Sequence, residues 1–182
     1  MRKTRRIRRS RLRRKRSSTS KRSSRHSGGT TSPIEVKVTY YTTTITNNQD
    51  LTNQTELYKK PLTIILSNTI PNKKYLVVMV DPDAPAGTWT HYAAVYTAGE
   101  HTAGEHTAEV YYPYEPPSPL PGTNTHHYIF RVYDATDTDV SNLEKKNGRA
   151  GNVYYKQVLV PIIKNKEIIN NEMQFIVKAP PA

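Results

Sequence analysis

The chain has 182 residues, which is long enough for one globular domain with a hydrophobic core. It contains no cysteine, which excludes disulfide bonds, a thiol nucleophile and a zinc site with cysteine ligands, and this favours an intracellular protein. No run of about 18 apolar residues is present, so no transmembrane segment is expected, and the charged N-terminus lacks the apolar stretch of a secretory signal peptide.

Positive charge is concentrated at the N-terminus. The formal net charge is +12, yet fourteen of the 27 basic side chains lie between Met1 and Arg25. The other thirteen are set against fifteen acidic ones, so the rest of the chain has a net charge of about −2. Residues 1–32 hold almost no apolar side chains and repel one another, so we expect a disordered basic arm there and one β domain over residues 33–182.

Two interpretations of the basic arm are open. Clusters such as residues 13–16 resemble nuclear-localisation segments, which would direct the protein to the nucleus. Alternatively, the arm binds nucleic acid or another polyanion by counterion release, in a sequence-independent and salt-sensitive way. Fourteen charges exceed what an import signal requires, which favours the second interpretation, although the two are compatible. The side chains expected to contact the polyanion are Arg5, Arg6, Arg8, Arg9, Arg11, Arg13, Arg14, Lys15 and Arg16.

The remaining sequence predicts mainly strands. Thirteen tyrosines, thirteen prolines and few helix-spaced leucines favour β structure. One or two helical turns are expected at residues 142–146. The pentapeptide Thr-Ala-Gly-Glu-His occurs twice in residues 97–106, and we interpret it as a solvated loop rather than as a metal site formed by His101 and His106. Strands are expected at residues 34–40, 62–66, 75–80, 92–96, 110–112, 129–133, 157–163 and 173–177.

One predicted strand ends in an unusual polar turn. Residues 75–80 form a continuous apolar run, typical of a strand buried on both faces. The sequence Asp-Pro-Asp-Ala-Pro follows, and its two prolines end the strand because proline has no backbone donor. The Asp81 and Asp83 carboxylates are therefore expected at the C-terminal end of the strand. Trp89 and His91 follow within ten residues.

A second stiff loop carries another histidine. The proline-rich residues 114–122 lead into His126 and Tyr128 at the start of the next strand. If the two loops converge at one rim of the sheet, they form a small polar pocket. Asp81 would then orient an imidazole, while His91, His126 and the Tyr128 hydroxyl would donate hydrogen bonds to an anionic head group.

Together these motifs resemble the phosphatidylethanolamine-binding protein family, also called the Raf kinase inhibitor-like family. The shared features are Asp-Pro-Asp-Ala-Pro, Trp-x-His and Pro-x-x-Gly-x-x-x-His-x-Tyr, and the resemblance covers most of residues 34–182. It implies an all-β fold, an antiparallel Greek-key β-sandwich with a large central sheet, a smaller sheet and few short helices. It also implies a surface pocket for phosphate, acetate or a phospholipid head group, and a cis peptide bond at Ala84-Pro85. The pocket residues expected from matching positions are Asp81, Pro85, Trp89, His91, Ser118, Pro119, His126 and Tyr128.

The sequence departs from the family pattern in several places. Ser118 replaces a glycine, which narrows the pocket or adds a hydroxyl donor, and His127 replaces an arginine. We expect the C-terminal segment that borders the pocket in animal members to be missing, and therefore expect a more open pocket and a weaker ligand site. The basic arm is an addition to the usual N-terminus of the family.

Three functions are compatible with these patterns. We favour a non-enzymatic binding module for a small anion or a phosphorylated partner, intracellular or nuclear, whose basic arm binds nucleic acid. The second is a structural or packaging protein associated with a virion and its capsid proteins, with a vestigial pocket, since some large DNA viruses encode relatives of the family. The third is an enzyme that uses Asp81 and His91 as an acid–base pair, or a metal held by histidines. No catalytic residue, metal or cofactor is expected, because no serine or cysteine nucleophile accompanies a histidine, and His126 and His127 face opposite ways on one strand.

Overall fold

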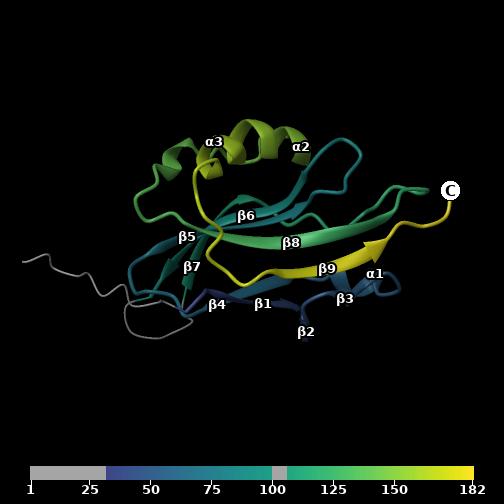
Figure 1. Cartoon of the computed structure of the whole chain (residues 1–182), viewed down its shortest axis with the longest axis horizontal. Coiled ribbons are helices and arrows are strands. Elements are labelled where there is room, and N and C mark those ends of the chain that lie inside the picture. The colour runs from purple at the N-terminus through teal and green to yellow at the C-terminus, as the bar shows by residue number, and fades with distance from the viewer. Residues whose placement is uncertain (1–31, 100–105) are drawn as a thin grey trace, which may run out of the picture. The chain divides into compact units, whose positions relative to one another are not determined.

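The computed structural model describes residues 32–99 and 106–182, so the basic arm and the centre of the pentapeptide repeat, including His101, lie outside the described residues. Residues 32–182 contain two sheets and a helical layer (Figure 1). The smaller sheet has the order β2-β1-β4, with β1 at Glu35–Tyr40, β2 at Thr43–Ile45 and β4 at Leu62–Ser67. The larger sheet has the order β3-β9-β8-β5-β6-β7. Its strands are β3 (Gln49–Asp50), β5 (Lys74–Asp81), β6 (Trp89–Ala98), β7 (His106–Tyr112), β8 (Thr125–Asp134) and β9 (Met173–Lys178), and the one-turn helix α1 (Thr55–Tyr58) precedes β4.

The larger sheet is mixed rather than wholly antiparallel. β5 pairs antiparallel with β6 and β8, and β8 pairs antiparallel with β9. The two-residue strand β3 runs parallel to β9, with Gln49 opposite Phe175. The expected all-antiparallel sheet is wrong at this edge, because the chain leaves the smaller sheet after β2 and meets β9 within a few residues, which sets its direction. The mostly-β fold with two sheets and short helices is confirmed, and the Greek-key connectivity stays a prediction.

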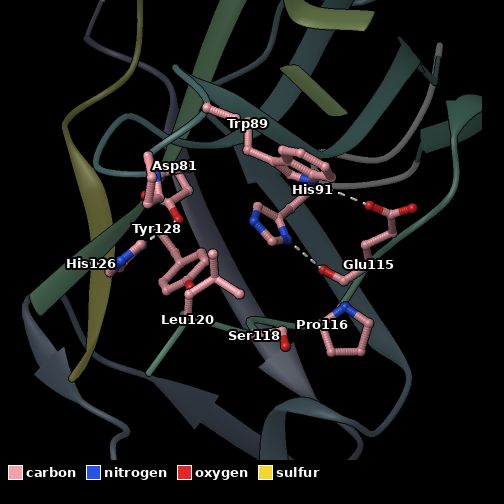
Figure 2. A pocket seen from close by; sticks show the side chains of 12 residues that line it. Asp81, Trp89, His91, Glu115, Pro116, Ser118, Leu120, His126 and Tyr128 are labelled. Carbon is pink, nitrogen blue, oxygen red and sulfur yellow. Dashed lines mark hydrogen bonds and ion pairs between the residues drawn. The ribbon is translucent and has the colours of Figure 1, made fainter. Parts of the chain in front are cut away.

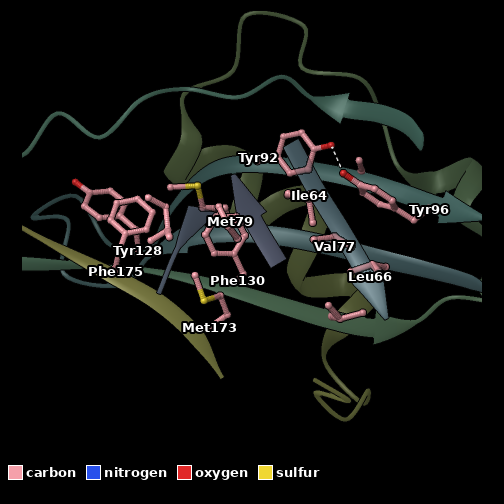
Figure 3. Packing of buried hydrophobic residues seen from close by; sticks show 14 of the residues in the cluster. Ile64, Leu66, Val77, Met79, Tyr92, Tyr96, Tyr128, Phe130, Met173 and Phe175 are labelled. Atoms are coloured by element: carbon pink, nitrogen blue, oxygen red, sulfur yellow. Dashed lines mark hydrogen bonds between the residues drawn. The ribbon is translucent and has the colours of Figure 1, made fainter. Parts of the chain in front are cut away.

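The two sheets pack face to face through an apolar core (Figure 3). On β5, alternate side chains point to opposite faces of the larger sheet, and both faces are covered. This is why residues 75–80 are apolar without alternation. The core between the sheets includes Tyr40, Ile64 and Leu66 from the smaller sheet and Val77, Met79, Phe130 and Phe175 from the larger one.

The second face of the larger sheet is covered by a helical layer, so the strand expected at residues 157–163 is wrong. The layer consists of α2 (Gly151–Tyr154), the π-helical turn η2 (Tyr155–Leu159) and α3 (Val160–Ile163). A short β-branched apolar run fits a buried strand or a buried helix equally well, and packing on the sheet decides between them here. Within residues 32–99 and 106–182, no helix is long and apolar enough to cross a bilayer.

The π turn is explained by a proline in the helical run. Pro161 has no backbone N–H and cannot donate to the preceding turn. The Val160 N–H donates to the Tyr155 carbonyl, five residues back, which widens the helix at this point. The helical turns expected at residues 142–146 are also wrong, since only the 3₁₀ turn η1 (Val140–Asn142) forms, and Leu143 is already extended.

The turn after β5 forms with trans peptide bonds. No cis peptide occurs among the described residues, so the cis bond expected at Ala84-Pro85 is wrong. The chain reverses through two successive turns instead. The Asp83 N–H donates to Asp81 Oδ1 at 2.9 Å, and the Gly87 N–H donates to the Ala84 carbonyl at 2.9 Å. Gly87 has a φ of +91°, which glycine adopts without steric cost.

Candidate functional site

A pocket of about 450 Å³ opens at one rim of the larger sheet (Figure 2). β5 is flanked by β6 and β8, and antiparallel pairing places the C-terminal end of β5 beside the N-terminal ends of both neighbours. This arrangement brings Asp81, His91, His126 and Tyr128 together. The proline-rich loop between β7 and β8 forms the opposite wall. The residues that line the pocket are Asp81, Ala84, Pro85, Ala86, Trp89, His91, Glu115, Pro116, Ser118, Leu120, His126 and Tyr128.

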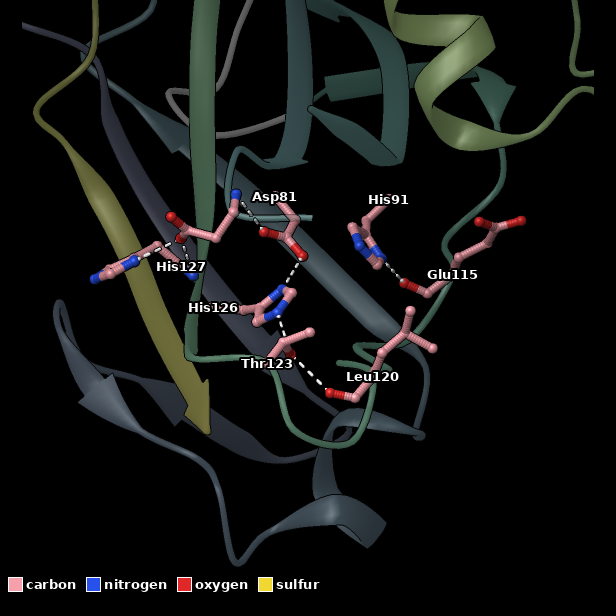
Figure 4. A network of polar contacts seen from close by, with 8 residues as sticks. Asp81, His91, Glu115, Leu120, Thr123, His126 and His127 are labelled. Atoms are coloured by element: carbon pink, nitrogen blue, oxygen red, sulfur yellow. Dashed lines mark hydrogen bonds and ion pairs between the residues drawn. The ribbon is translucent and has the colours of Figure 1, made fainter. Parts of the chain in front are cut away.

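A buried ion pair connects β5 to β8 beneath the pocket (Figure 4). Asp81 Oδ2 lies 2.7 Å from His126 Nδ1, and both side chains are almost completely buried. His126 Nε2 lies 2.9 Å from the Thr123 hydroxyl, which in turn donates to the Leu120 carbonyl at 2.7 Å. The Thr123 oxygen therefore accepts from the Nε2–H of His126, and Nδ1 shares a hydrogen bond with Asp81 Oδ2. This chain of hydrogen bonds holds the pocket loop against the sheet.

His91 faces the pocket as a neutral hydrogen-bond acceptor. Its Nδ1 lies 2.8 Å from the Glu115 backbone oxygen, which only accepts, so Nδ1 carries the proton. Burial lowers the pKa of His91 to about 4; the Asp81 charge opposes this shift, while His126 and Lys146 reinforce it. At neutral pH the Nε2 atom keeps a free lone pair, and Figure 2 shows this side of the ring turned toward Asp81 and Tyr128. Neither His91 nor His126 presents a free N–H to the pocket.

Tyr128 supplies a hydroxyl that lacks a good partner. Its ring lies edge-on to His91, with centroids 5.0 Å apart, and stacks on Phe175 at 5.2 Å. The hydroxyl oxygen is buried without a well-formed hydrogen bond to the described part of the chain, and it has only a weak interaction with the Ser118 backbone amide. Burial and the nearby Asp81 charge raise the pKa of Tyr128, so the hydroxyl stays protonated and can donate.

A second charge pair borders the pocket at Glu115. One carboxylate oxygen of Glu115 accepts from Tyr112 Oη at 2.8 Å and from Trp89 Nε1 at 3.3 Å. The other oxygen pairs with Lys146, whose ammonium also lies 4.4 Å from the centre of the Tyr112 ring. Gly151, the first residue of α2, packs directly against the Trp89 indole. The wall formed by Trp89 and Glu115 is thus held by the helical layer and by the loop that carries Lys146.

Other residues near the rim lie outside the pocket. His127 points away from the buried His126, as alternation along a strand requires, and its Nδ1 pairs with Asp83 Oδ2 at 2.7 Å. The Gly122 N–H donates to the Pro180 carbonyl at 2.9 Å, so the C-terminal residues contact the loop that precedes β8. None of residues 179–182 lines the pocket.

The structure brings together all but one of the pocket residues expected from sequence. Pro119 does not line the pocket, because successive residues of an extended loop face opposite ways, and Ser118 and Leu120 are the ones that face inward. Sequence reasoning missed Glu115, although it is the one acidic residue in the proline-rich loop. It also missed Lys146, which no local pattern connects to the pocket. The basic side chains assigned to polyanion binding lie outside the described residues.

Comparisons with known proteins agree with this architecture. The family model for phosphatidylethanolamine-binding protein matches residues 41–166, more than half of the chain. Among solved structures, the chain is similar to carboxypeptidase Y inhibitor complexed with its cognate proteinase, with 18% identity and a TM-score of 0.60 over 81% of this chain and 84% of that one. It is also similar to a phosphatidylethanolamine-binding protein from Plasmodium vivax, with 16% identity and a TM-score of 0.56 over 80% of this chain and 85% of that one. The two structural likenesses establish the fold, and the family match establishes that this chain belongs to the phosphatidylethanolamine-binding protein family.

Proposed function

We propose that the protein is a non-enzymatic binding module whose pocket takes a small oxyanionic head group, such as that of a phosphate ester. The observation that carries this proposal is the buried Tyr128 hydroxyl without a well-formed hydrogen bond, on a ring that lies edge-on to His91, whose Nε2 keeps a free lone pair. A buried hydroxyl left unpaired costs about 1–3 kcal/mol, which a ligand oxygen would recover. The apolar walls contributed by Pro85, Trp89 and Leu120 exclude water and strengthen polar contacts at the base.

One arrangement near the pocket has the order of a catalytic triad. A hydroxyl, an imidazole and a carboxylate lie in a row at hydrogen-bond distance, and they belong to Thr123, His126 and Asp81. However, the Thr123 hydroxyl gives its proton to the Leu120 carbonyl and not to His126, and Thr123 does not line the pocket. The hydroxyl is therefore not activated as a nucleophile. We assign these residues to the support of the pocket loop, which favours binding over catalysis.

Tyr128→Phe is expected to lose ligand affinity without losing stability. Removing the hydroxyl deletes a donor to the ligand, which lowers affinity by about tenfold or more for a hydrogen bond to a charged group. It also removes an unsatisfied buried polar atom, so the free energy of unfolding stays equal or rises. The measurements are a titration with phosphorylethanolamine at pH 6, followed through the His91 ring signals by NMR, and urea unfolding of the same samples.

Tyr41→Phe is the matched control for this experiment. Tyr41 is exposed and does not line the pocket, so the same loss of a hydroxyl should change neither affinity nor stability. The exposed His127 serves as an internal reference, because its signals should not follow the ligand. Unchanged His91 signals at millimolar phosphorylethanolamine, or equal affinities for the protein and Tyr128→Phe, would contradict the proposal.

For the basic arm, the proposed function is binding of nucleic acid or another polyanion, supported by the fourteen basic side chains before residue 26. The full chain is expected to bind a duplex oligonucleotide and to lose about 10³-fold or more in affinity between 50 and 200 mM salt. A chain beginning at Thr31 should bind weakly at both concentrations. Equal affinities of the two chains would remove this role, and with it the alternative in which the arm packages nucleic acid in a virion. A chain that binds nucleic acid but no head group would instead favour that packaging alternative.

A further inference from the structure

The charges around the pocket cancel in pairs. Asp81 is paired with His126, whose two ring nitrogens are both committed to protein acceptors. Glu115 is paired with Lys146, and that carboxylate also receives hydrogen bonds from Trp89 and Tyr112. No cation that lines or borders the pocket in the described ranges is left to neutralise a ligand. A fully deprotonated dianion would therefore bury its charge next to two carboxylates without compensation, which is strongly unfavourable.

Besides the exposed Ser118 hydroxyl, which can donate or accept, the pocket offers a ligand one buried donor and one acceptor. Tyr128 offers an O–H group, which its raised pKa keeps protonated. His91 offers the lone pair of Nε2, because its N–H is used by the Glu115 backbone oxygen. The charged and titratable groups that face His91 are Asp81, Glu115, His126, Tyr128 and Lys146. Burial has a larger effect on the His91 pKa than these charges and keeps it near 4. The ring therefore stays neutral at neutral pH, and its Nε2 remains an acceptor.

We propose that the pocket selects a phosphomonoester in its monoanionic form, which donates its P–OH to His91 Nε2 and accepts from the Tyr128 hydroxyl. This inference rests on the proposed function and names the ligand class for the same pocket. A phosphodiester head group has no P–OH proton to donate, and sulfate carries none near neutral pH, so both are poor ligands. The ligand itself brings the proton that it shares with His91. This proton lowers the charge of the ligand, so no free cation of the protein is required to neutralise it.

The test compares a ligand that carries this proton with two oxyanions that lack it. Phosphorylcholine is a monoester whose ammonium group cannot donate, glycerophosphoethanolamine is a diester whose ammonium can, and sulfate is an oxyanion without a proton. At pH 5.5, calorimetry on the full chain should show phosphorylcholine binding at least about tenfold more tightly than the other two. Because a phosphomonoester loses its second proton near pH 6, its affinity should fall about tenfold per pH unit above that value.

A variant of His91 tests the role of the acceptor. His91→Gln places an amide near the position of Nε2, and an amide can donate as well as accept. The preference for phosphorylcholine over sulfate should therefore fall below about threefold in this variant. If the variant does not fold, the preference measured on the unaltered protein decides the question. Vesicles carrying phosphatidic acid, compared with phosphorylcholine in solution, separate a lipid-borne from a soluble phosphomonoester. Because the basic arm can bind an anionic vesicle without the pocket, only saturation that Tyr128→Phe weakens supports the inference.

The outcomes distinguish this inference from the proposed function. Equal binding of sulfate and phosphorylcholine at pH 5.5 would overturn the selection of a protonated ligand and leave an anion pocket in place. Tighter binding of glycerophosphoethanolamine than of phosphorylcholine would show that an ammonium group is the donor, which also overturns it. Binding of none of these ligands at millimolar concentration would overturn the proposed function together with the inference.

Discussion

His126→Leu is expected to lower the free energy of unfolding by about 3–5 kcal/mol, because it leaves the Asp81 carboxylate buried without its partner. The two side chains are only 2% and 4% exposed, and their nitrogen and oxygen atoms lie 2.7 Å apart. The substitution also removes the hydrogen bond between the His126 ring and the Thr123 hydroxyl, which itself donates to the Leu120 carbonyl. The pocket loop therefore loses this attachment to β8. Urea unfolding monitored by circular dichroism measures the loss, and phosphorylcholine affinity should fall with it.

The neighbouring residue provides a matched control. His127 makes an ion pair with Asp83 at the same 2.7 Å distance, but its side chain is 42% exposed. His127→Leu should therefore cost less than about 1 kcal/mol, since solvent screens an exposed pair. The double variant Asp81→Asn/His126→Leu should recover part of the loss of His126→Leu, because no buried charge is left unpaired. Equal losses for His126→Leu and His127→Leu would contradict a structural role for the buried pair.

Gly151→Val is expected to lower the free energy of unfolding by about 3 kcal/mol, at the upper end of the usual cost of overpacking. A Cβ atom at Gly151 would lie 2.3 Å from Trp89 Nε1 and 2.4 Å from its Cδ1, far inside van der Waals contact. The indole would have to move, and its hydrogen bond to Glu115 at 3.3 Å would break. Because Trp89 and Glu115 form one wall of the pocket, affinity for phosphorylcholine should also fall by about tenfold or more.

A second substitution separates the clash from any effect on the helix. In the double variant Gly151→Val/Trp89→Leu, the leucine is smaller than the indole it replaces and leaves room for the valine. Part of the stability lost in Gly151→Val should therefore return. Val153→Ala, two residues further along the same helix, alters an exposed position and should change the free energy of unfolding by less than about 0.5 kcal/mol. If the double variant is less stable than Gly151→Val, contact with Trp89 is not the reason that glycine is required there.

Local sequence patterns predicted the parts of the fold that depend on neighbouring residues. The apolar run at residues 75–80 is the central part of β5, and the prolines that follow end it at Asp81. Period-two alternation correctly predicted that His126 and His127 face opposite ways, and the structure shows that His126 is the buried one. The two loops rich in proline lie at the same rim of the sheet, as their positions after and before strands suggested. These features follow from backbone geometry, which a few consecutive residues determine.

Other features required knowledge of what packs against what. Residues 157–163 are β-branched and apolar, so they match a strand locally, but the open face of the larger sheet accepts them as a helix. The Ala84-Pro85 bond is trans because hydrogen bonds from Asp83 and Gly87 already turn the chain. Pro119 lies outside the pocket because its neighbours face inward. The local sequence allowed two conformations at residues 157–163, where packing on the sheet selected the helix. At Ala84-Pro85 it also allowed two, and hydrogen bonds within the turn accompany the trans bond.

For the pocket, the sequence alone predicted most of the polar side chains that assemble, whereas the tertiary structure added Glu115 and decided what these side chains can do. Asp81, His91, His126 and Tyr128 are at the ends of strands that any pairing of this kind brings together. Which of them donates depends on hydrogen-bond partners supplied by Glu115 and Thr123, and the charge balance depends on Lys146. Each histidine nitrogen and hydroxyl can either donate or accept. Only the three-dimensional arrangement assigns those roles, because it occupies the N–H groups of both histidines and leaves the Nε2 lone pair of His91 and the Tyr128 hydroxyl for a ligand.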